Sequence, residues 1–335
     1  MIEKPAVLSN VLERAVRALR RAARSDDLSI ITYHAVTDRA CPLFSGRAGF
    51  AHSSELIADH AAFLARRYRP IRLSDAIDAW RSQTGVGRAA VVMFDDGYAG
   101  SLRVAASVLQ RHGIPTAVSV VTGVIDNTDL IWRDKLHWLL SGSHGERTRD
   151  AVRALYRAAG VETSPAEPIM ELTRRVFLSE SLSCLLDELL ARAGTSGPAL
   201  AERYRPYVTS EELGRADPRW VEIVNHTHGH PVMAGLPLKR QIEELETARA
   251  AIVRWTGRAP RAFAIPFGLR EHYDDTTLTA AAATGHTAML DLRRRGNHAH
   301  RVRKGVLELS RFPAPVDGSE ALARVMTATF GKGTA

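Results

Sequence analysis

Apolar segments with the character of β-strands alternate along this chain with longer segments of helical periodicity, and this alternation limits the folds open to it. Successive strands that are joined through helices usually lie parallel, because the helix carries the chain back to the starting end of the sheet. The expected class is therefore α/β, with a barrel or a doubly wound sheet as the architecture. The six clearest strand segments are LSIITYHAV, AAVVMFDDG, TAVSVVTG, VEIVNHT, AFAIPFG and TAMLDL.

The alternation is interrupted between about residues 125 and 212, where nearly the whole segment has a helical pattern. A connection of this length is too long for a simple loop. We interpret it as a helical insertion on the rim of a domain that covers residues 28–320. Residues 321–335 are expected to form the end of a C-terminal helix and a tail.

Residues 1–27 are expected to form an amphipathic helix, because apolar residues recur at helical spacing among several arginines. Such a helix packs on the protein's own core or lies on an anionic membrane surface, and the sequence leaves both open. The segment lacks the apolar region of a signal peptide, and no run of about 18 apolar residues could span a membrane. The expected location is the cytoplasm, with peripheral contact to the inner membrane face as the second option.

The basic charge balance does not by itself indicate a nucleic-acid partner. The chain has 45 lysines and arginines against 37 aspartates and glutamates, which gives a formal net charge of +8. The arginines are scattered, and the sequence contains no zinc-finger spacing, RNP-like run or basic heptad region. We therefore expect no nucleic-acid binding. Two widely separated cysteines, Cys41 and Cys184, suggest no disulfide framework.

Two carboxylates, Asp95 and Asp96, follow directly after the apolar run VVMF and precede Gly97. The apolar run predicts a buried strand that ends near this glycine. Both side chains are therefore expected at the C-terminal mouth of a strand, where two like charges shift each other's pKa. A pair of acids in such a place indicates two separate tasks.

A second polar cluster, HTHGH, follows the apolar run VEIV and supplies His226, His228 and His230. One helical turn would place the imidazoles of His226 and His230 on one face, with His228 pointing elsewhere. Neutral imidazoles are common ligands of divalent metals. One aspartate and two histidines form a facial triad with open positions on the metal, and the other aspartate remains free as a base. The alternative for any one histidine is an ordinary surface or core residue.

These motifs resemble those of the polysaccharide deacetylase family, also called the NodB-homology family or carbohydrate esterase family four. MFDDGY resembles the first motif of the family, HTHGHP the second and AFAIPFG the third. The resemblance covers roughly residues 28–315 without the insertion. It implies a distorted (β/α)7-type barrel and a divalent metal ion, most commonly Zn2+. The pair Tyr33–His34 is similar to the branch that acts on poly-N-acetylglucosamine.

Carried over to this chain, the resemblance makes Asp95 the catalytic base and Asp96, His226 and His230 the metal ligands. In the implied reaction, metal-activated water attacks the carbonyl of an N-acetyl group while Asp95 accepts the proton. A backbone N–H near Tyr98 is expected to stabilise the oxyanion. The third motif adds expected substrate contacts at Pro266, Phe267 and Gly268.

Two positions depart from the family pattern. Ala264 stands where the third motif has an arginine that orients the catalytic aspartate, and the fifth-motif histidine, the general acid, is missing. Arg311 is the candidate to replace the arginine, with a surface or structural ion pair as the alternative. His34 is the candidate to replace the acid, with a structural hydrogen bond at a strand end as the alternative.

The expected function is removal of an N-acetyl group from an amino sugar in a glycan, a glycolipid or a sugar conjugate, including nucleotide-linked and lipid-linked intermediates. Two other functions stay open. A barrel without catalysis could bind sugar or a partner protein, and an aspartate with two histidines could hold iron(II) in an oxygenase. The spare aspartate and the motif match favour a hydrolase.

Overall fold

A computed structural model describes residues 27–82, 84–293, 296–297 and 301–330. The amphipathic helix expected at residues 1–27 lies outside the described residues except for Asp27, which begins the first strand. Residues 331–335 of the expected tail also lie outside them. The last described helix, α13 (Ser319–Phe330), begins shortly before the expected boundary at residue 321. Among the helices of the described ranges, none combines the length and the apolar character that crossing a membrane requires.

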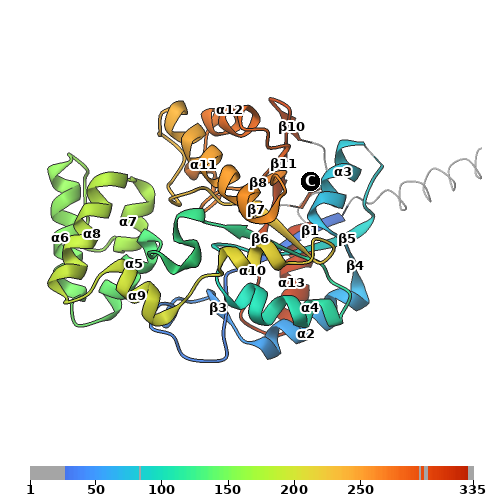
Figure 1. Cartoon of the computed structure of the whole chain (residues 1–335), viewed down its shortest axis with the longest axis horizontal. Coiled ribbons are helices and arrows are strands. Elements are labelled where there is room, and N and C mark those ends of the chain that lie inside the picture. Colours follow the sequence, from blue (N-terminus) through green and yellow to red (C-terminus); the bar gives the residue numbers. More distant parts are fainter. Residues whose placement is uncertain (1–26, 83, 294–295, 298–300, 331–335) are drawn as a thin grey trace, which may run out of the picture.

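A parallel barrel forms the centre of the described chain (Figure 1). The strands β11 (Val306–Ser310) and β12 (Phe312–Pro313) act together as one stave, because β11 pairs with β9 and β12 pairs with β1. This shared segment closes the barrel, and the predicted (β/α)7-type fold is confirmed. The other staves, in spatial order, are β1 (Asp27–Tyr33), β5 (Arg88–Phe94), β6 (Thr116–Val120), β7 (Val221–Asn225), β8 (Ala262–Ala264) and β9 (Ala288–Asp291).

Four short strands lie at the margins of this barrel. They are β4 beside β5, β10 antiparallel to β11, and the separate parallel pair of β2 and β3. Their bounds are Arg69–Pro70 for β4, Val302–Arg303 for β10, Ala35–Val36 for β2 and Ala51–His52 for β3.

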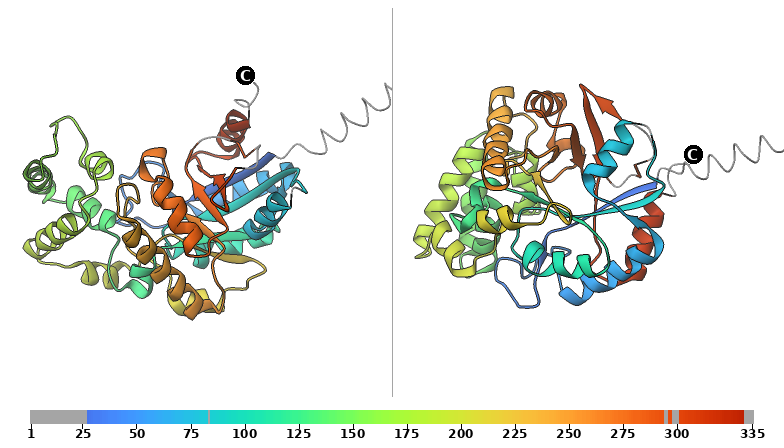
Figure 2. Two further views of the ribbon diagram at one scale, coloured as in Figure 1. Left: turned by 90° about the horizontal axis from the view of Figure 1, so that it is seen from above. Right: turned by 45° about the vertical axis from the view of Figure 1, so that its right-hand side comes forward.

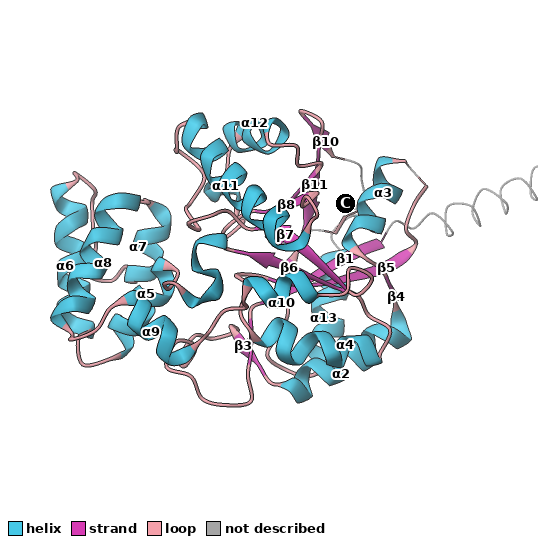
Figure 3. Cartoon of the chain, in the orientation of Figure 1, coloured by secondary structure: helices cyan, strands magenta, loops and turns pink. Residues whose placement is uncertain are grey.

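The strands are apolar on both faces because each face is covered, as is usual for parallel sheets. Val91 and Met93 of β5 belong to the cluster inside the barrel, which also contains Trp80 of α3 (Leu73–Arg81). Val92 and Phe94 point outward and pack against the surrounding helices. Figure 3 shows the strands at the centre with the helices around them. These helices include α2 (Ser54–Arg67), α4 (Ala106–Arg111), which follows a π-helical turn at Ser101–Ala105, α11 (Leu238–Thr256), α12 (Asp275–Ala283) and α13.

The segment expected to be an insertion contains six helices between β6 and β7. Helices α5 to α9 form a lobe on one side of the barrel, at the left in Figure 1 and again in both views of Figure 2. Its apolar cluster includes Leu186 of α8 and reaches Tyr98, just beyond the end of β5. The lobe and the C-terminal end of β5 therefore share one core. The helices are α5 (Trp132–Ser141), α6 (Gly145–Ala158), α7 (Ile169–Arg175), α8 (Ser179–Arg192), α9 (Gly197–Tyr204) and α10 (Ser210–Arg215).

A buried polar pair supports the end of β7. Asn225 Nδ2 donates to Nε2 of His286 at 3.1 Å, and Nδ1 of His286 lies 2.8 Å from Oγ1 of Thr284. Because Nε2 accepts a hydrogen bond, His286 is neutral in this arrangement. Burial, with a further contribution from Arg249, lowers the pKa of His286 to about 4.

This neutral histidine predicts a loss of stability in acid. The unfolded chain takes up a proton on His286 near pH 6.5, whereas the folded chain takes it up near pH 4. The contribution to stability is therefore complete above about pH 6.5 and falls, by up to roughly 3 kcal/mol, as the pH approaches 4. Denaturant unfolding at pH 7 and pH 4.5 should show a smaller pH effect in His286→Gln than in wild type. The exposed His112→Gln serves as the control, and equal pH effects in all three proteins would contradict the assignment.

Candidate active site

Four staves of the barrel end at one place, and each supplies a polar residue immediately after its last strand position. His34 follows β1, Asp95 follows β5, His226 follows β7 and Arg311 follows β11. The N–H of Asp95 donates to the carbonyl of Tyr33 at 2.9 Å, which keeps the ends of β1 and β5 level. The C-terminal ends of strands carry the active site in barrels of this kind, so these residues define the candidate active site.

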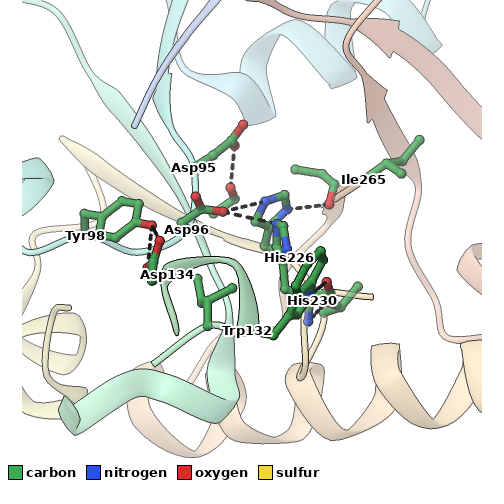
Figure 4. Close-up of polar contacts among 12 residues, drawn as sticks. Asp95, Asp96, Tyr98, Trp132, Asp134, His226, His230 and Ile265 are labelled. Carbon is green, nitrogen blue, oxygen red and sulfur yellow. Dashed lines mark hydrogen bonds and ion pairs between the residues drawn. The ribbon is translucent and has the colours of Figure 1, made fainter. Parts of the chain in front are cut away.

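Asp96, His226 and His230 converge in the buried part of this site (Figure 4). Oδ1 of Asp96 lies 3.2 Å from Nε2 of His226 and 3.3 Å from Nε2 of His230. Burial raises the pKa of Asp96, but its contacts with the two imidazoles outweigh that effect and hold it well below its usual range. The three residues predicted as metal ligands therefore lie together, and His228 is exposed outside the cluster.

The donor atoms of this cluster fit a divalent metal ion. Nδ1 of His226 donates to the carbonyl of Ala264 at 2.7 Å, so Nε2 can present a lone pair. A lone pair that faces the Asp96 carboxylate is repelled unless a proton or a metal ion lies between the two atoms. Two ligands of a tetrahedral zinc ion are about 3.3 Å apart at the usual bond lengths, in agreement with the two distances from Asp96.

The helical turn predicted from His226 to His230 is wrong, because this segment is a loop. Thr227 and His230 have left-handed backbone angles, with φ of 70° and 58°. The N–H of Thr227 donates to the side chain of Asn225 at 2.8 Å, and the N–H of His230 donates to Oγ1 of Thr227 at 3.0 Å. These two bonds fold the loop back on itself, so that both imidazoles reach Asp96.

The insertion also holds His230 in place. The indole N–H of Trp132, the first residue of α5, donates to the carbonyl of His230 at 2.9 Å. On the other side, the ring of Phe267 contacts the His230 imidazole edge to face, with 4.9 Å between centroids. The orientation of this imidazole thus depends on two segments that are distant from it in sequence.

The carboxylate of Asp95 receives three hydrogen bonds. Ser119 Oγ donates to Oδ1 at 2.6 Å, while Thr32 Oγ1 and Arg311 Nε each donate to Oδ2 at 3.0 Å. Burial raises the pKa of Asp95, but Arg311 and then His226 and His34 lower it to about 2. Asp95 is therefore ionised at neutral pH, and its position is fixed.

Arg311 lies against Asp95, where a third-motif arginine would otherwise have to reach. Its side chain is 2% exposed, so the surface ion pair considered as an alternative is wrong. Besides Asp95, the guanidinium donates to the carbonyls of Leu290 and Ile265. Ala264, the residue at the arginine position of the motif, instead supplies its carbonyl to His226.

His34 lines the same cleft as Asp95 and Asp96 and is half-buried. Its ring stacks on that of Phe50, with 5.0 Å between centroids. Burial lowers the pKa of His34 more than the neighbouring Asp96 and Asp95 raise it. The unshifted value that would suit a proton donor at neutral pH is thus absent before substrate binds.

The phenol of Tyr98 has a structural place at the junction with the insertion. Its hydroxyl donates to the buried carboxylate of Asp134, 2.8 Å from Oδ2, and the hydroxyl of Tyr207 donates to the same oxygen at 2.6 Å. Nη1 of Arg47 completes this cluster at 2.6 Å from Oδ1. The side chain of Tyr98 is therefore committed to Asp134.

The backbone N–H of Tyr98 has a different situation from its side chain. Tyr98 and Tyr207 form an antiparallel bridge whose two hydrogen bonds are donated by the N–H groups of Ala99 and Val208. The bridge thus leaves the N–H of Tyr98 unused, as the predicted oxyanion contact requires.

The third motif contributes less to the cleft than predicted. Phe267 lines it, with a left-handed φ of 62°. Pro266 and Gly268 are buried in the turn behind this ring, and the prediction that they contact substrate is corrected accordingly. A Cβ on Gly268 would lie 2.8 Å from the backbone nitrogen of Leu292, so the glycine permits a close backbone approach.

Sequence reasoning missed several charged residues of the cleft, which has a volume of about 410 Å³. Arg47 comes from the loop before β3, while Arg133 and Asp134 belong to α5 and Arg174 belongs to α7. None of these residues lies near a motif, and scattered arginines gave no pattern. They become visible only when the insertion is placed over the barrel.

Comparisons with known proteins agree with this geometry. The sequence model of the family described as polysaccharide deacetylase matches residues 196–289, which contain the second and third motifs. The resemblance to the polysaccharide deacetylases is therefore confirmed. Asp95 and Asp96 lie outside the matched residues, and the barrel is what brings them to the histidines of the second deacetylase motif.

Solved structures of deacetylases share the fold of this chain. Streptococcus pyogenes deacetylase PplD, in complex with acetate, has 15% identity, a TM-score of 0.59 and coverage of 90% of this chain and 98% of that chain. IcaB from Ammonifex degensii has 16% identity, a TM-score of 0.54 and coverage of 90% and 98%. A polysaccharide deacetylase from Bacillus cereus has 14% identity, a TM-score of 0.56 and coverage of 90% and 69%. No curated protein sequence matches the chain.

The geometry predicts which histidines are needed for metal binding. His230→Ala removes one of three donor atoms and should lose the ion, whereas His228→Ala, outside the cluster, should keep it. Elemental analysis of the purified, folded variants measures the difference. Metal loss in His228→Ala with retention in His230→Ala would overturn the assignment.

Proposed function

We propose that this protein is a metal-dependent hydrolase that removes an N-acetyl group from an amino sugar. The observation that carries the proposal is the ionised Asp95 beside the cluster of Asp96, His226 and His230 at the open end of a barrel. One carboxylate can hold a metal ion while the other accepts a proton. Proteins of similar fold are described as a deacetylase and a polysaccharide deacetylase, which supports N-deacetylation as the reaction.

The proposed ion is divalent, and zinc is the first candidate because two imidazoles and one carboxylate suit it. When bound, such an ion supplies a Lewis acid that polarises a carbonyl and raises the acidity of water. Asp96, His226 and His230 would hold it. The same donor set suits iron(II), so metal content and acetate release need to be measured on the same preparation.

The chain's own residues account for the proton transfers. Asp95 accepts the proton of the attacking water, whose oxygen bonds to the amide carbon. The N–H of Tyr98 is placed to donate to the resulting oxyanion. The carbon–nitrogen bond then breaks, and His34 is the proposed donor of the proton that lets the amine leave. The products are acetate and the free amino sugar.

The proposed substrate is a glycan, a glycolipid or a sugar-conjugate intermediate, with nucleotide-linked and lipid-linked N-acetyl sugars included. We further propose that the reaction takes place in the cytoplasm or at the inner membrane face. Screening these sugar classes for acetate release identifies the substrate.

A non-catalytic sugar-binding barrel is the second candidate. The observation in its favour is the absence of the third-motif arginine and the fifth-motif histidine. The contact of Arg311 with Asp95 supports the catalytic alternative, because it supplies the orienting cation from another stave. A metal-loaded protein that binds sugar but releases no acetate would favour the non-catalytic barrel.

The two carboxylates are predicted to differ in what their removal does. Asp95→Asn should lower the rate of acetate release by about 10²–10⁴-fold, the usual size of a general-base contribution, and leave metal occupancy nearly unchanged. Asp96→Asn should lower both. Activity and metal content are measured in both variants after their folding is checked by thermal unfolding, and equal metal loss in the two would show that the roles are misassigned.

The acid role of His34 predicts a difference between leaving groups. An amine leaves slowly from a tetrahedral intermediate unless it is protonated, whereas the phenolate of an activated acetate ester needs no proton. His34→Ala should therefore slow amide cleavage far more than ester cleavage. The measurement is the ratio of the two rates in the variant and in wild type. An unchanged ratio would exclude His34 as the acid.

A further inference from the structure

One cation in the wall of the active-site cleft lacks a counter-charge among the described residues. The guanidinium of Arg133 has no hydrogen bond or ion pair to any described side chain or carbonyl, and its Nε is buried. The other arginines of the cleft are all paired with acids: Arg311 with Asp95, Arg47 with Asp134, and Arg174 with Glu171.

Arg133 remains charged despite this environment. Burial and then the nearby Arg47 lower its pKa to about 10, which is still well above neutral pH. The ring of Phe267 lies 4.9 Å from Cζ and offsets part of the lost hydration. The carboxylates of Asp96 and Asp134 act on Arg133 from a distance, but both already have close partners. A buried charge without a paired partner is costly, so this site favours a ligand that brings an anion.

The position of Arg133 fits an anion on the substrate itself. Phe267 contacts Arg133 with its ring face and contacts the imidazole of His230 with 4.9 Å between centroids. A single ring therefore separates the free guanidinium from a metal-ligand candidate. A sugar that presents its acetamide to Asp96 and His230 would have another substituent, or the unit linked to it, beside Arg133.

We propose that Arg133 binds an oxyanion, a phosphate or a carboxylate, carried by the amino-sugar substrate or by the unit linked to it. A guanidinium suits this task because its planar fork can donate two parallel hydrogen bonds to either group. The acetamide end of the substrate rests on the proposed function, but recognition of the anion requires no turnover. An uncharged polymer of N-acetylated sugar would leave Arg133 unpaired and is a poorer ligand.

Calorimetric binding to metal-depleted protein tests the proposal, because phosphate cannot then bind to the metal. The ligands are N-acetylglucosamine, its 1-phosphate and N-acetylmuramic acid, which carries a carboxylate. In wild type, at least one charged sugar should bind about 10–100-fold more tightly than the neutral one, as expected for hydrogen bonds to a charged group. Arg133→Gln should remove this preference and leave the affinity for the neutral sugar unchanged. Arg133→Lys should restore part of it.

Arg174→Gln is the matched control, since Arg174 lines the same cleft but is paired with Glu171. This variant should keep the preference for the charged sugar. The proposal is overturned if wild type shows no preference, if the preference survives in Arg133→Gln, or if both arginine variants lose it equally. An equal loss of affinity for all three sugars in Arg133→Gln also overturns it, because Arg133 would then only support Phe267.

These outcomes are separate from the proposed function, which fails when metal-loaded protein releases no acetate from any N-acetyl sugar. Where acetate is released, kcat/KM for nucleotide-linked and lipid-linked substrates shows which carrier supplies the phosphate. The same ratio measured in Arg133→Gln should fall for the charged substrates alone.

Discussion

The buried ion pair between Arg311 and Asp95 is the interaction on which the rest of the site depends. Arg311 is the one residue between β11 and β12, where the closing segment of the barrel changes its partner from β9 to β1. Its other donors go to the carbonyls of Leu290 and Ile265. A buried guanidinium is tolerated only when it is paired and hydrogen-bonded. Barrel closure and the position of the catalytic carboxylate are therefore fixed by the same side chain.

The helical insertion completes the site as well as covering it. Trp132 holds the carbonyl of His230, and Asp134 joins Tyr98 of the barrel to Arg47 of the loop before β3. The lobe also brings Arg133 into the cleft. Since these contacts come from the first helix of the insertion, the lobe affects both the metal-ligand loop and the charge that a substrate meets.

Backbone strain is concentrated at the site. Four of the non-glycine residues with left-handed angles in the described chain are Asp96, Thr227, His230 and Phe267. Each such conformation costs about 1–3 kcal/mol and persists only where the surroundings hold it. Here the surroundings are the hydrogen bonds and ring contacts of the two motif loops. Sequence patterns assume regular backbone, which is why they predicted a helical turn between His226 and His230.

The sequence by itself determined the parallel barrel, the helical character of the insertion and the meeting of Asp95, Asp96 and the two histidines at strand ends. These features follow from local periodicity, because apolar runs set the strands and parallel strands end at one edge. Only the tertiary structure decided that Arg311 reaches Asp95, that Pro266 and Gly268 are buried, and that Arg133 enters the cleft without a partner. Such relations join residues that are far apart along the chain, and a linear pattern carries no information about which distant side chains will share a buried space.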